Sequence, residues 1–280
     1  MTEPEQTTRP SRPAAGSAAS LSHKLRLIGV LSRREIEGRY RGSVLGIVWS
    51  MITPLLMLGI YTFVFGTVFT SRWPPQDNGD VPGSFSVILF AGLILFQIFS
   101  EVVNRAPTLI LSNLSYVKRV VFPLEILVPV SVATALFHAA VSLLILLPFI
   151  FITFGSISPT ALLLPLCVAP LLLYTLGLGW FLASLGTYWR DIGQITATVT
   201  TALLFLAPIF FPLSALPEWI QPVLILNPVS LPIEQTRAVL LFGHLPDFVG
   251  LGIYTAIGAL VCAGGYMWFQ ATRKGFADVL

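Results

Sequence analysis

The fold is decided by the longest uncharged stretch of the chain, residues 126–189, which reads ILVPVSVATALFHAAVSLLILLPFIFITFGSISPTALLLPLCVAPLLLYTLGLGWFLASLGTYW. None of its 64 residues is Asp, Glu, Lys or Arg, each of which costs roughly 2.5 to 3.5 kcal/mol at the centre of a membrane helix. At about 1.5 Å per residue, three crossings of about 30 Å would leave almost nothing for two turns, so two helices fit. The turn between them is predicted at Gly155–Pro159, because Gly and Pro with flanking Ser favour turns.

The same scan, extended in both directions, finds further uncharged stretches on either side. Of the 280 residues, 55% are apolar and only 10% charged, against roughly 25% charged in soluble domains. The sequence therefore predicts an all-α integral membrane protein, without room for a soluble catalytic domain. The six predicted crossings lie near residues 46–70, 84–103, 126–153, 161–186, 195–213 and 248–271.

The positions of Lys and Arg predict the orientation of the chain. An even number of crossings places both termini on one side. Fourteen of the 16 Lys and Arg residues lie on that side of the predicted crossings, and only Arg72 and Arg237 lie on the other. By the positive-inside rule, we expect both termini in the cytoplasm.

The segment before the first crossing divides into two parts. Residues 1–20 contain no apolar run and two acidic residues, so they are expected to form a disordered tail rather than a secretory signal. Residues 21–41 place Leu and Ile on one helical arc, although Arg39 breaks the pattern. One interpretation is an amphipathic helix at the cytoplasmic surface of the bilayer; the other is a solvated positive flank that only fixes topology. The helix is favoured, and residues 42–280 are expected to form the membrane domain.

Several kinds of site are missing from the sequence. No Lys follows a Gly, so there is no P-loop for a nucleotide. His138 is the only ionisable residue deep in a predicted crossing, and it is interpreted as a hydrogen-bonded packing residue rather than a proton relay, which argues against a secondary transporter. Cys167 and Cys262 lack metal-site spacing and are expected to pack, with a disulfide as the alternative. A net charge of +3 is too small to suggest nucleic acid.

A family resemblance is carried by residues 33–49, which read RREIEGRYRGSVLGIVW. Further matching features are Pro54, the WRDI element at residues 189–192, and Asn227-Pro228-Val229 followed by Glu234 and Arg237. Together they resemble the membrane subunits of type-2 ABC exporters, in the branch that exports O-antigens, capsules, teichoic acids and cell-wall galactan. The resemblance covers about residues 25–275.

This resemblance implies a set of partners. The chain would pair with a second copy of itself and with two copies of a separate nucleotide-binding ATPase, which would use ATP and Mg while this chain binds no cofactor. A lipid-linked polysaccharide would move along the axis of the dimer, across the bacterial cytoplasmic membrane. The resemblance also implies short helices dipping into the outer leaflet between residues 214 and 247, for which an extracellular loop lying flat is the alternative.

Two groups of candidate site residues follow from the resemblance. The first would transmit movement from the ATPase; the alternatives are topology-fixing charges with their counter-ions, and a helix that covers the underside of its own bundle. The second would line the export path, since aromatic rings offer flat faces to sugar C–H groups; the alternative is ordinary packing and interface anchoring. The coupling candidates are Arg33, Glu35, Arg39, Tyr116, Lys118, Arg119, Arg190 and Asp191. The path candidates are Trp49, Tyr61, Phe65, Phe69, Phe205, Phe210 and Phe211.

Smaller features are expected to be structural. The threonines of the fifth crossing, among them Thr196 and Thr200, are expected to bond within their helix or across an interface, and Gly177 and Gly179 to permit close helix approach. Two rival functions stay open: a drug or lipid exporter of the same superfamily, and a membrane-embedded enzyme. The second is disfavoured because no cluster of carboxylates, and no Ser or Cys with a His base, is visible.

Overall fold

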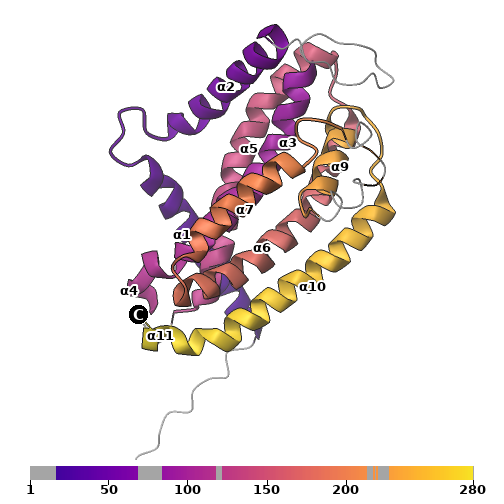
Figure 1. The fold of residues 1–280 in the computed structure, drawn as a ribbon. Coiled ribbons are helices and arrows are strands. Elements are labelled where there is room, and N and C mark those ends of the chain that lie inside the picture. Colours follow the sequence, from indigo (N-terminus) through magenta and orange to yellow (C-terminus); the bar gives the residue numbers. More distant parts are fainter. Residues whose placement is uncertain are drawn as a thin grey trace, which may run out of the picture.

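The computed structural model describes residues 17–68, 84–117, 122–212, 217, 219 and 227–279. Within these ranges every regular element is a helix, so the all-α prediction is confirmed (Figure 1). The elements are α1 (Ser17–Tyr40), η1 (Gly46–Val48), α2 (Trp49–Tyr61), η2 (Thr62–Val68), α3 (Ser84–Leu109), η3 (Leu111–Asn113), α4 (Leu114–Val117), η4 (Leu124–Ile126), α5 (Leu127–Phe154), η5 (Pro159–Leu163), α6 (Leu164–Tyr188), α7 (Ile192–Leu206), α9 (Ser230–Leu240), α10 (Phe248–Thr272), η7 (Arg273–Gly275) and α11 (Phe276–Val279).

Five stretches of the described chain are long and apolar enough to cross a membrane, and they match five of the six predicted crossings. They are Gly46–Val68, Ser84–Leu109, Leu124–Phe154, Pro159–Tyr188 and Phe248–Gly275. The predicted turn between α5 and α6 is also present. Gly155 ends α5 with a left-handed backbone (φ 78°), and the Ser158 side chain accepts a hydrogen bond from the Thr160 amide in front of η5. The chain is therefore a multi-span membrane protein.

The fifth predicted crossing, 195–213, is too long. Helix α7 has 15 residues and ends at Leu206, so its length of about 22 Å is less than the roughly 30 Å of bilayer hydrocarbon. The physical reason is Pro208, since the residue before a proline avoids the helical region. Ala207 accordingly has φ −87° and ψ 150°, an extended backbone.

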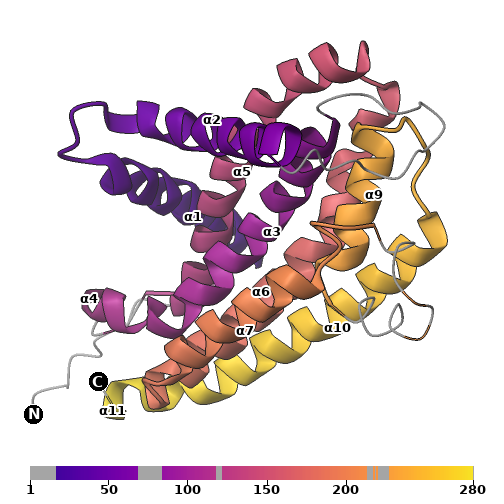
Figure 2. The same ribbon diagram turned by 45° about the horizontal axis from the view of Figure 1, so that its top comes forward.

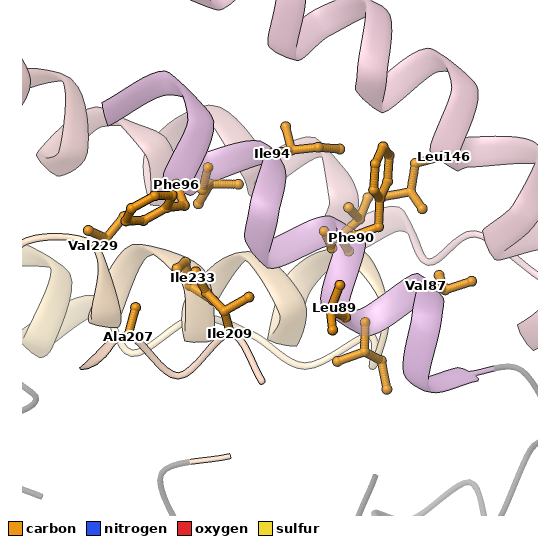
Figure 3. Close-up of a cluster of buried hydrophobic side chains, with 14 of the residues drawn as sticks. Val87, Leu89, Phe90, Ile94, Phe96, Leu146, Ala207, Ile209, Val229 and Ile233 are labelled. Atoms are coloured by element: carbon orange, nitrogen blue, oxygen red, sulfur yellow. The ribbon is translucent and has the colours of Figure 1, made fainter. Parts of the chain in front are cut away.

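Helix α3 is the centre of the bundle. It packs against α5, α6, α7 and α9 (Figures 1 and 2), and 78% of its apolar window is buried. Figure 3 shows this core along α3 from Val87 onward: Phe90 lies near Leu146 of α5 and, farther from Val87, Phe96 lies near Val229. In contrast, only 11% of the window in Gly46–Val68 is buried. This first span lies at the edge of the bundle, where it contacts α3 and α5, and a loop joins it to α1 (Figure 2).

Helices α6 and α10 lie in close contact because glycines line their interface. A Cβ atom on Gly177 would collide with the backbone of Val261 and Cys262, and one on Gly265 would collide with the backbone of Gly177. The expectation of close helix approach is confirmed here. Cys167 and Cys262 are both free thiols, so the disulfide alternative is wrong and the packing interpretation is confirmed.

Helix α1 begins at Ser17, four residues before the predicted start; residues 1–16 lie outside the described residues. One side of α1 packs on α5, where Ser32 is buried and its hydroxyl donates to the Val130 carbonyl at 3.4 Å. Leu21 and Leu25 are about 60% exposed. The apolar arc of α1 is thus uncovered at its beginning, as a helix in the lipid interface would require.

Candidate coupling surface and export path

The predicted cytoplasmic end of the bundle brings together elements from distant parts of the sequence. Figure 1 shows α1, α4 and α11 at this end, beside the turn between α6 and α7 and the end of α10. Most of the described coupling candidates lie here. Lys118 and Arg119 lie outside the described residues.

One carboxylate fastens the start of α1 to this end. Glu125, 8% exposed, accepts hydrogen bonds from Lys24 Nζ at 2.9 Å and from Arg273 Nη1 at 3.0 Å. Its backbone carbonyl also accepts one from Trp180 Nε1 at 2.9 Å. The hydrogen bond to Glu125 raises the pKa of Lys24, because it stabilises the ammonium form. This ion-pair group links α1, η4 and η7 and was not foreseen.

A second ionic group holds the end of α1. Arg39 Nη1 lies 2.8 Å from Glu101 Oε1 of α3 and 3.0 Å from His138 Nδ1 of α5. His138 Nδ1 also lies 3.2 Å from Glu101 Oε2, and the Tyr40 hydroxyl lies 3.2 Å from His138 Nε2. The position of Arg39 against the amphipathic pattern is thus explained, since its partners are carboxylate and imidazole groups of the bundle. His138 is hydrogen-bonded as expected, but in a charged group that includes Glu101.

A cleft of about 300 Å³ lies between α1, the end of α3 and α4. Glu35 lines it and forms an ion pair with Arg105 of α3, and Arg34, Asn113 and Tyr116 complete its polar wall. The Tyr116 ring stacks on Phe122, with ring centres 4.4 Å apart. Two coupling candidates, Glu35 and Tyr116, are thereby brought into one cleft.

The Arg190 and Asp191 side chains are exposed on the short turn between α6 and α7. This turn is fixed against the end of α3, because a Cβ on Gly186 would collide with the backbone of Pro107, and one on Gly193 would lie 4.0 Å from the Pro107 ring. Arg33 is also exposed and bonds only to Glu37 within α1, at 2.8 Å, among the described residues. These three side chains point away from the bundle and are available to a partner.

A cavity of about 190 Å³ lies on the other side of α3, between α2 and α7. Its floor is α3, which lies between those two helices in Figure 2. Both polar and aromatic groups line it. The lining residues are Thr53, Pro54, Met57, Tyr61, Phe90, Leu93, Ile94, Phe96, Gln97, Ser100 and Leu204.

The aromatic path candidates fall into different environments. Tyr61 lines this cavity, whereas Phe65 packs against Phe85 with ring centres 5.3 Å apart. Phe205, 63% exposed, stacks on Phe210 beyond the end of α7 at 5.8 Å. Trp49 is exposed, Phe211 is half-buried, and Phe69 lies outside the described residues. The structure therefore brings Tyr61 to a cavity and pairs Phe205 with Phe210, but does not gather all of them in one place.

Sequence reasoning missed the polar side chains on the outward face of α3. Gln97, Ser100, Asn104 and Thr108, called here the polar strip, recur at steps of three or four residues and are exposed or half-buried in an otherwise buried helix. The Thr200 hydroxyl of α7 donates to Asn104 Oδ1 at 2.9 Å. The signal was available, since this spacing puts the four residues on one helical face.

The structural role of Arg237 was also missed, because the sequence analysis used this residue only for topology and as part of the family resemblance. It is 2% exposed, and its guanidinium donates to the backbone carbonyls of Ile88 at 3.0 Å, Ile209 at 2.9 Å and Pro208. The Pro208 and Ile209 carbonyls lie just beyond the end of α7, so Arg237 supplies donors to a backbone that has left the helix, and its bond to Ile88 ties that backbone to α3. Gly92 leaves room for it, as a Cβ there would lie 2.6 Å from Arg237 Nη2.

Asn227 secures the same break from the other side. Its side-chain amide donates to the Leu203 carbonyl of α7 at 3.1 Å, and its own carbonyl accepts from the Tyr254 hydroxyl of α10 at 3.1 Å. The Asn227-Pro228 element thus ties α7 to α10. Between α7 and α10 the structure describes one short helix, α9 (Ser230–Leu240), in the range 214–247 where short helices were expected, while most of residues 213–226 lies outside the described residues. In the part that the structure describes, no group of three or more His, Cys, Asp or Glu side chains could hold a metal.

Comparison with known proteins agrees with this architecture. The O-antigen export system permease protein RfbA of Myxococcus xanthus is 28% identical over 252 residues, 89% of this chain and 93% of that protein. The polysialic acid transport protein KpsM of Escherichia coli is 28% identical over 236 residues, 84% and 88% of the two chains. The capsule polysaccharide export inner-membrane protein CtrC of Neisseria meningitidis serogroup B is 26% identical over 227 residues, 78% and 80%. Residues 26–241 match the ABC-2 type transporter family, and the chain therefore belongs to it.

Proposed function

We propose that this chain is the membrane subunit of an ATP-driven exporter that moves a lipid-linked polysaccharide out of the cytoplasm. The observation that carries the proposal is the family match over residues 26–241, together with relatives named for O-antigen, polysialic acid and capsule export. The chain would act as a transport permease and not as an enzyme. ATP and Mg would be used by a separate ATPase subunit, and this chain would bind no cofactor.

In the proposed assembly, two copies of the chain lie in a bacterial cytoplasmic membrane with both termini in the cytoplasm, and each binds one ATPase subunit. The sparse burial of Gly46–Val68 supports a second copy, because a span with so few internal contacts offers its surface to lipid or to another protein. Nucleic acid has no part in this function.

Coupling to the ATPase would use the outward-pointing groups at the predicted cytoplasmic end. Arg190 and Asp191 are exposed on a turn fixed against Pro107, so a push on the turn would be carried into α3 without bending a flexible loop. Movement of α1 would reach α3 and α5 through the ionic group of Arg39, Glu101 and His138. Glu35 and Tyr116 would act through the cleft that they line.

The polysaccharide would pass along the face of α3 that lies between α2 and α7. Tyr61, which lines the cavity on this face, supports the placement, because an aromatic ring can contact sugar C–H groups without holding them through directed bonds. The stacked Phe205 and Phe210 at the end of α7 would extend the aromatic surface.

The test is purification of the intact complex from its native host, followed by identification of the bound ATPase and glycolipid. We expect an ATPase subunit to co-purify and ATP-dependent transport of the glycolipid into inside-out vesicles. An assembled complex that moves drugs or short lipids and leaves polysaccharide behind would instead support the drug or lipid exporter of the same superfamily. Alanine at Arg190 and Asp191 is expected to abolish most export; intact assembly and export in that variant would contradict the coupling assignment.

A further inference from the structure

The side chain of Gln97 occupies an unusual place in the molecule. It lies near the middle of α3, a helix whose apolar window is 78% buried, yet Gln97 itself is exposed. Ser100 and Thr108 satisfy their hydroxyl groups on carbonyls of their own helix, and Asn104 accepts from Thr200. Within the described ranges the Gln97 amide makes no side-chain hydrogen bond.

A primary amide at this depth cannot face lipid without penalty. Moving an amide from water into an apolar medium without a hydrogen-bonding partner costs about 2 kcal/mol or more. The rest of the polar strip adds the Asn104 amide, which uses one oxygen lone pair on Thr200 and leaves its NH₂ group exposed. The polar strip therefore requires water, a polar ligand or another protein on this side of α3.

The cavity beside Gln97 has the chemistry of a carbohydrate site. Gln97 and Ser100 offer an amide and a hydroxyl group, while Tyr61, Phe90 and Phe96 offer aromatic surface in the same cavity. Sugars present hydroxyl groups at the edge of the ring and C–H groups on its faces, so they match amides and aromatic rings together. At about 190 Å³ the cavity is smaller than the roughly 300–1,000 Å³ of pockets that enclose drug-sized ligands, so it fits a single sugar unit.

We infer that the polar strip of α3 forms one wall of a hydrated path, and that the cavity at Gln97 is the position at which the hydroxyl groups of successive sugar units exchange hydrogen bonds with the protein. This inference rests on the proposed function, because it assigns the glycan contact of that path to Gln97 and Ser100 as well as to the aromatic rings. The polar strip runs along α3 from its middle to its predicted cytoplasmic end. Each contact is weak and replaceable, so a chain can advance one unit at a time.

Water access to Gln97 can be measured without any substrate. With Cys167 and Cys262 replaced by Ala, the variants Gln97→Cys and Leu260→Cys are each introduced into the full chain in complex with its ATPase. Leu260 is the matched control, since it is 73% exposed on the outside of α10, where the predicted neighbour is lipid. A charged thiol reagent is applied with and without nucleotide. Because the thiolate is the reacting species, a thiol in contact with water reacts and one in hydrocarbon does not.

We expect Gln97→Cys to react at least tenfold faster than Leu260→Cys in one of the two nucleotide conditions. Equal and slow reaction of both in both conditions overturns the hydrated path. Formation of a disulfide between two Gln97→Cys copies also overturns it, because the polar strip would then be a contact between protomers.

The sugar contact is tested by export. Gln97→Leu is expected to slow polysaccharide transport on the order of fivefold, the equivalent of one hydrogen bond, while ATPase binding and basal ATP hydrolysis stay at the wild-type level. Gln97→Asn, which keeps the amide, is expected to recover most of the rate. If the wild-type complex moves polysaccharide and Gln97→Leu moves it equally fast, the Gln97 assignment fails alone. If the wild-type complex moves none, the proposed function fails, and the reagent measurement still decides whether the path is hydrated.

Discussion

Helix α3 and the first span, Gly46–Val68, are both apolar enough to cross a membrane, yet they differ in how far the rest of the chain buries them. In α3, 78% of the most apolar stretch is buried, whereas in the first span only 11% of that stretch is buried. Large side chains such as Met51, Leu56 and Ile60 are about half exposed on α2. Because lipid solvates such side chains as well as protein does, hydropathy reports insertion and says nothing of which span is packed.

The two spans also differ in how other parts of the chain hold them. Helix α3 receives Arg237 near one end and Arg39 at Glu101, so the buried span is anchored at two depths by cations from other elements. The first span is connected mainly through the loop to α1 and through contacts with α5 and α3. Leu58 is the one side chain of the described part of this span that belongs to the buried hydrophobic core, so a change in the position of the span relative to α3 would disturb few core contacts and would change the cavity between them.

The largest effect is expected from removing the cation that α3 shares with α7 and α9. Arg237→Leu removes the donors to the Pro208 and Ile209 carbonyls, which lie outside any helix, and the link to Ile88 of α3; each buried carbonyl left without a donor costs about 1–3 kcal/mol. We expect a loss of about 3 kcal/mol or more in the free energy of unfolding, measured by denaturant titration of the purified chain in detergent. Arg26→Leu, on the exposed side of α1, is the control and is expected to change little. Equal stability of the two variants would show that Arg237 does not support the broken end of α7.

A smaller effect should distinguish the two spans by the same chemical change. A methyl group added in Gly92→Ala would lie 2.6 Å from Arg237 Nη2, so the guanidinium must move. Gly59→Ala on α2 meets nothing within 4 Å. We expect Gly92→Ala to lower the free energy of unfolding by about 2 kcal/mol, and Gly59→Ala to leave it unchanged or raise it by up to about 1 kcal/mol through helix propensity.

The measurement is again denaturant titration, run on both variants in one detergent. A destabilised Gly59→Ala variant would mean that α2 is packed by a second copy in the purified state. Its dependence on protein concentration would then identify that interface.

The parts of the fold that could be predicted from the sequence are those with local signals. Runs without charge located five spans, and Gly155 with Pro159 located a turn, because these signals are local. The end of α7 was misplaced although Pro208 stood in the sequence, since a charge scan does not read backbone conformation. The ends of a membrane helix therefore have to be predicted from the charge scan and the positions of proline together.

The polar contacts were the part that could not be predicted. Glu101, His138 and Arg39 lie on three helices, and Glu125 joins Lys24 to Arg273 across most of the chain. A single sequence does not show which residues are close in space, so it could not show that these side chains pair with one another. The polar strip was different, because its spacing is visible on one helix; only its exposure on a buried helix gave it meaning, and that required the structure.

The smallest of the expected effects concerns how α1, and with it the first span, is held to the bundle. Glu101→Gln removes the charge that faces Arg39 at 2.8 Å and His138 at 3.2 Å. Since Arg39 is nearly half exposed, we expect a loss of only about 1 kcal/mol in the free energy of unfolding. Hydrogen exchange should change more visibly: amides in α1 and α2 should exchange faster while those of α3 stay protected, because local opening then precedes global unfolding. Arg33→Gln, which breaks only the exposed pair with Glu37, is the control. Faster exchange spread evenly over α2 and α3 would mean that the two spans open as one unit, and the contrast between them would then lie in burial alone.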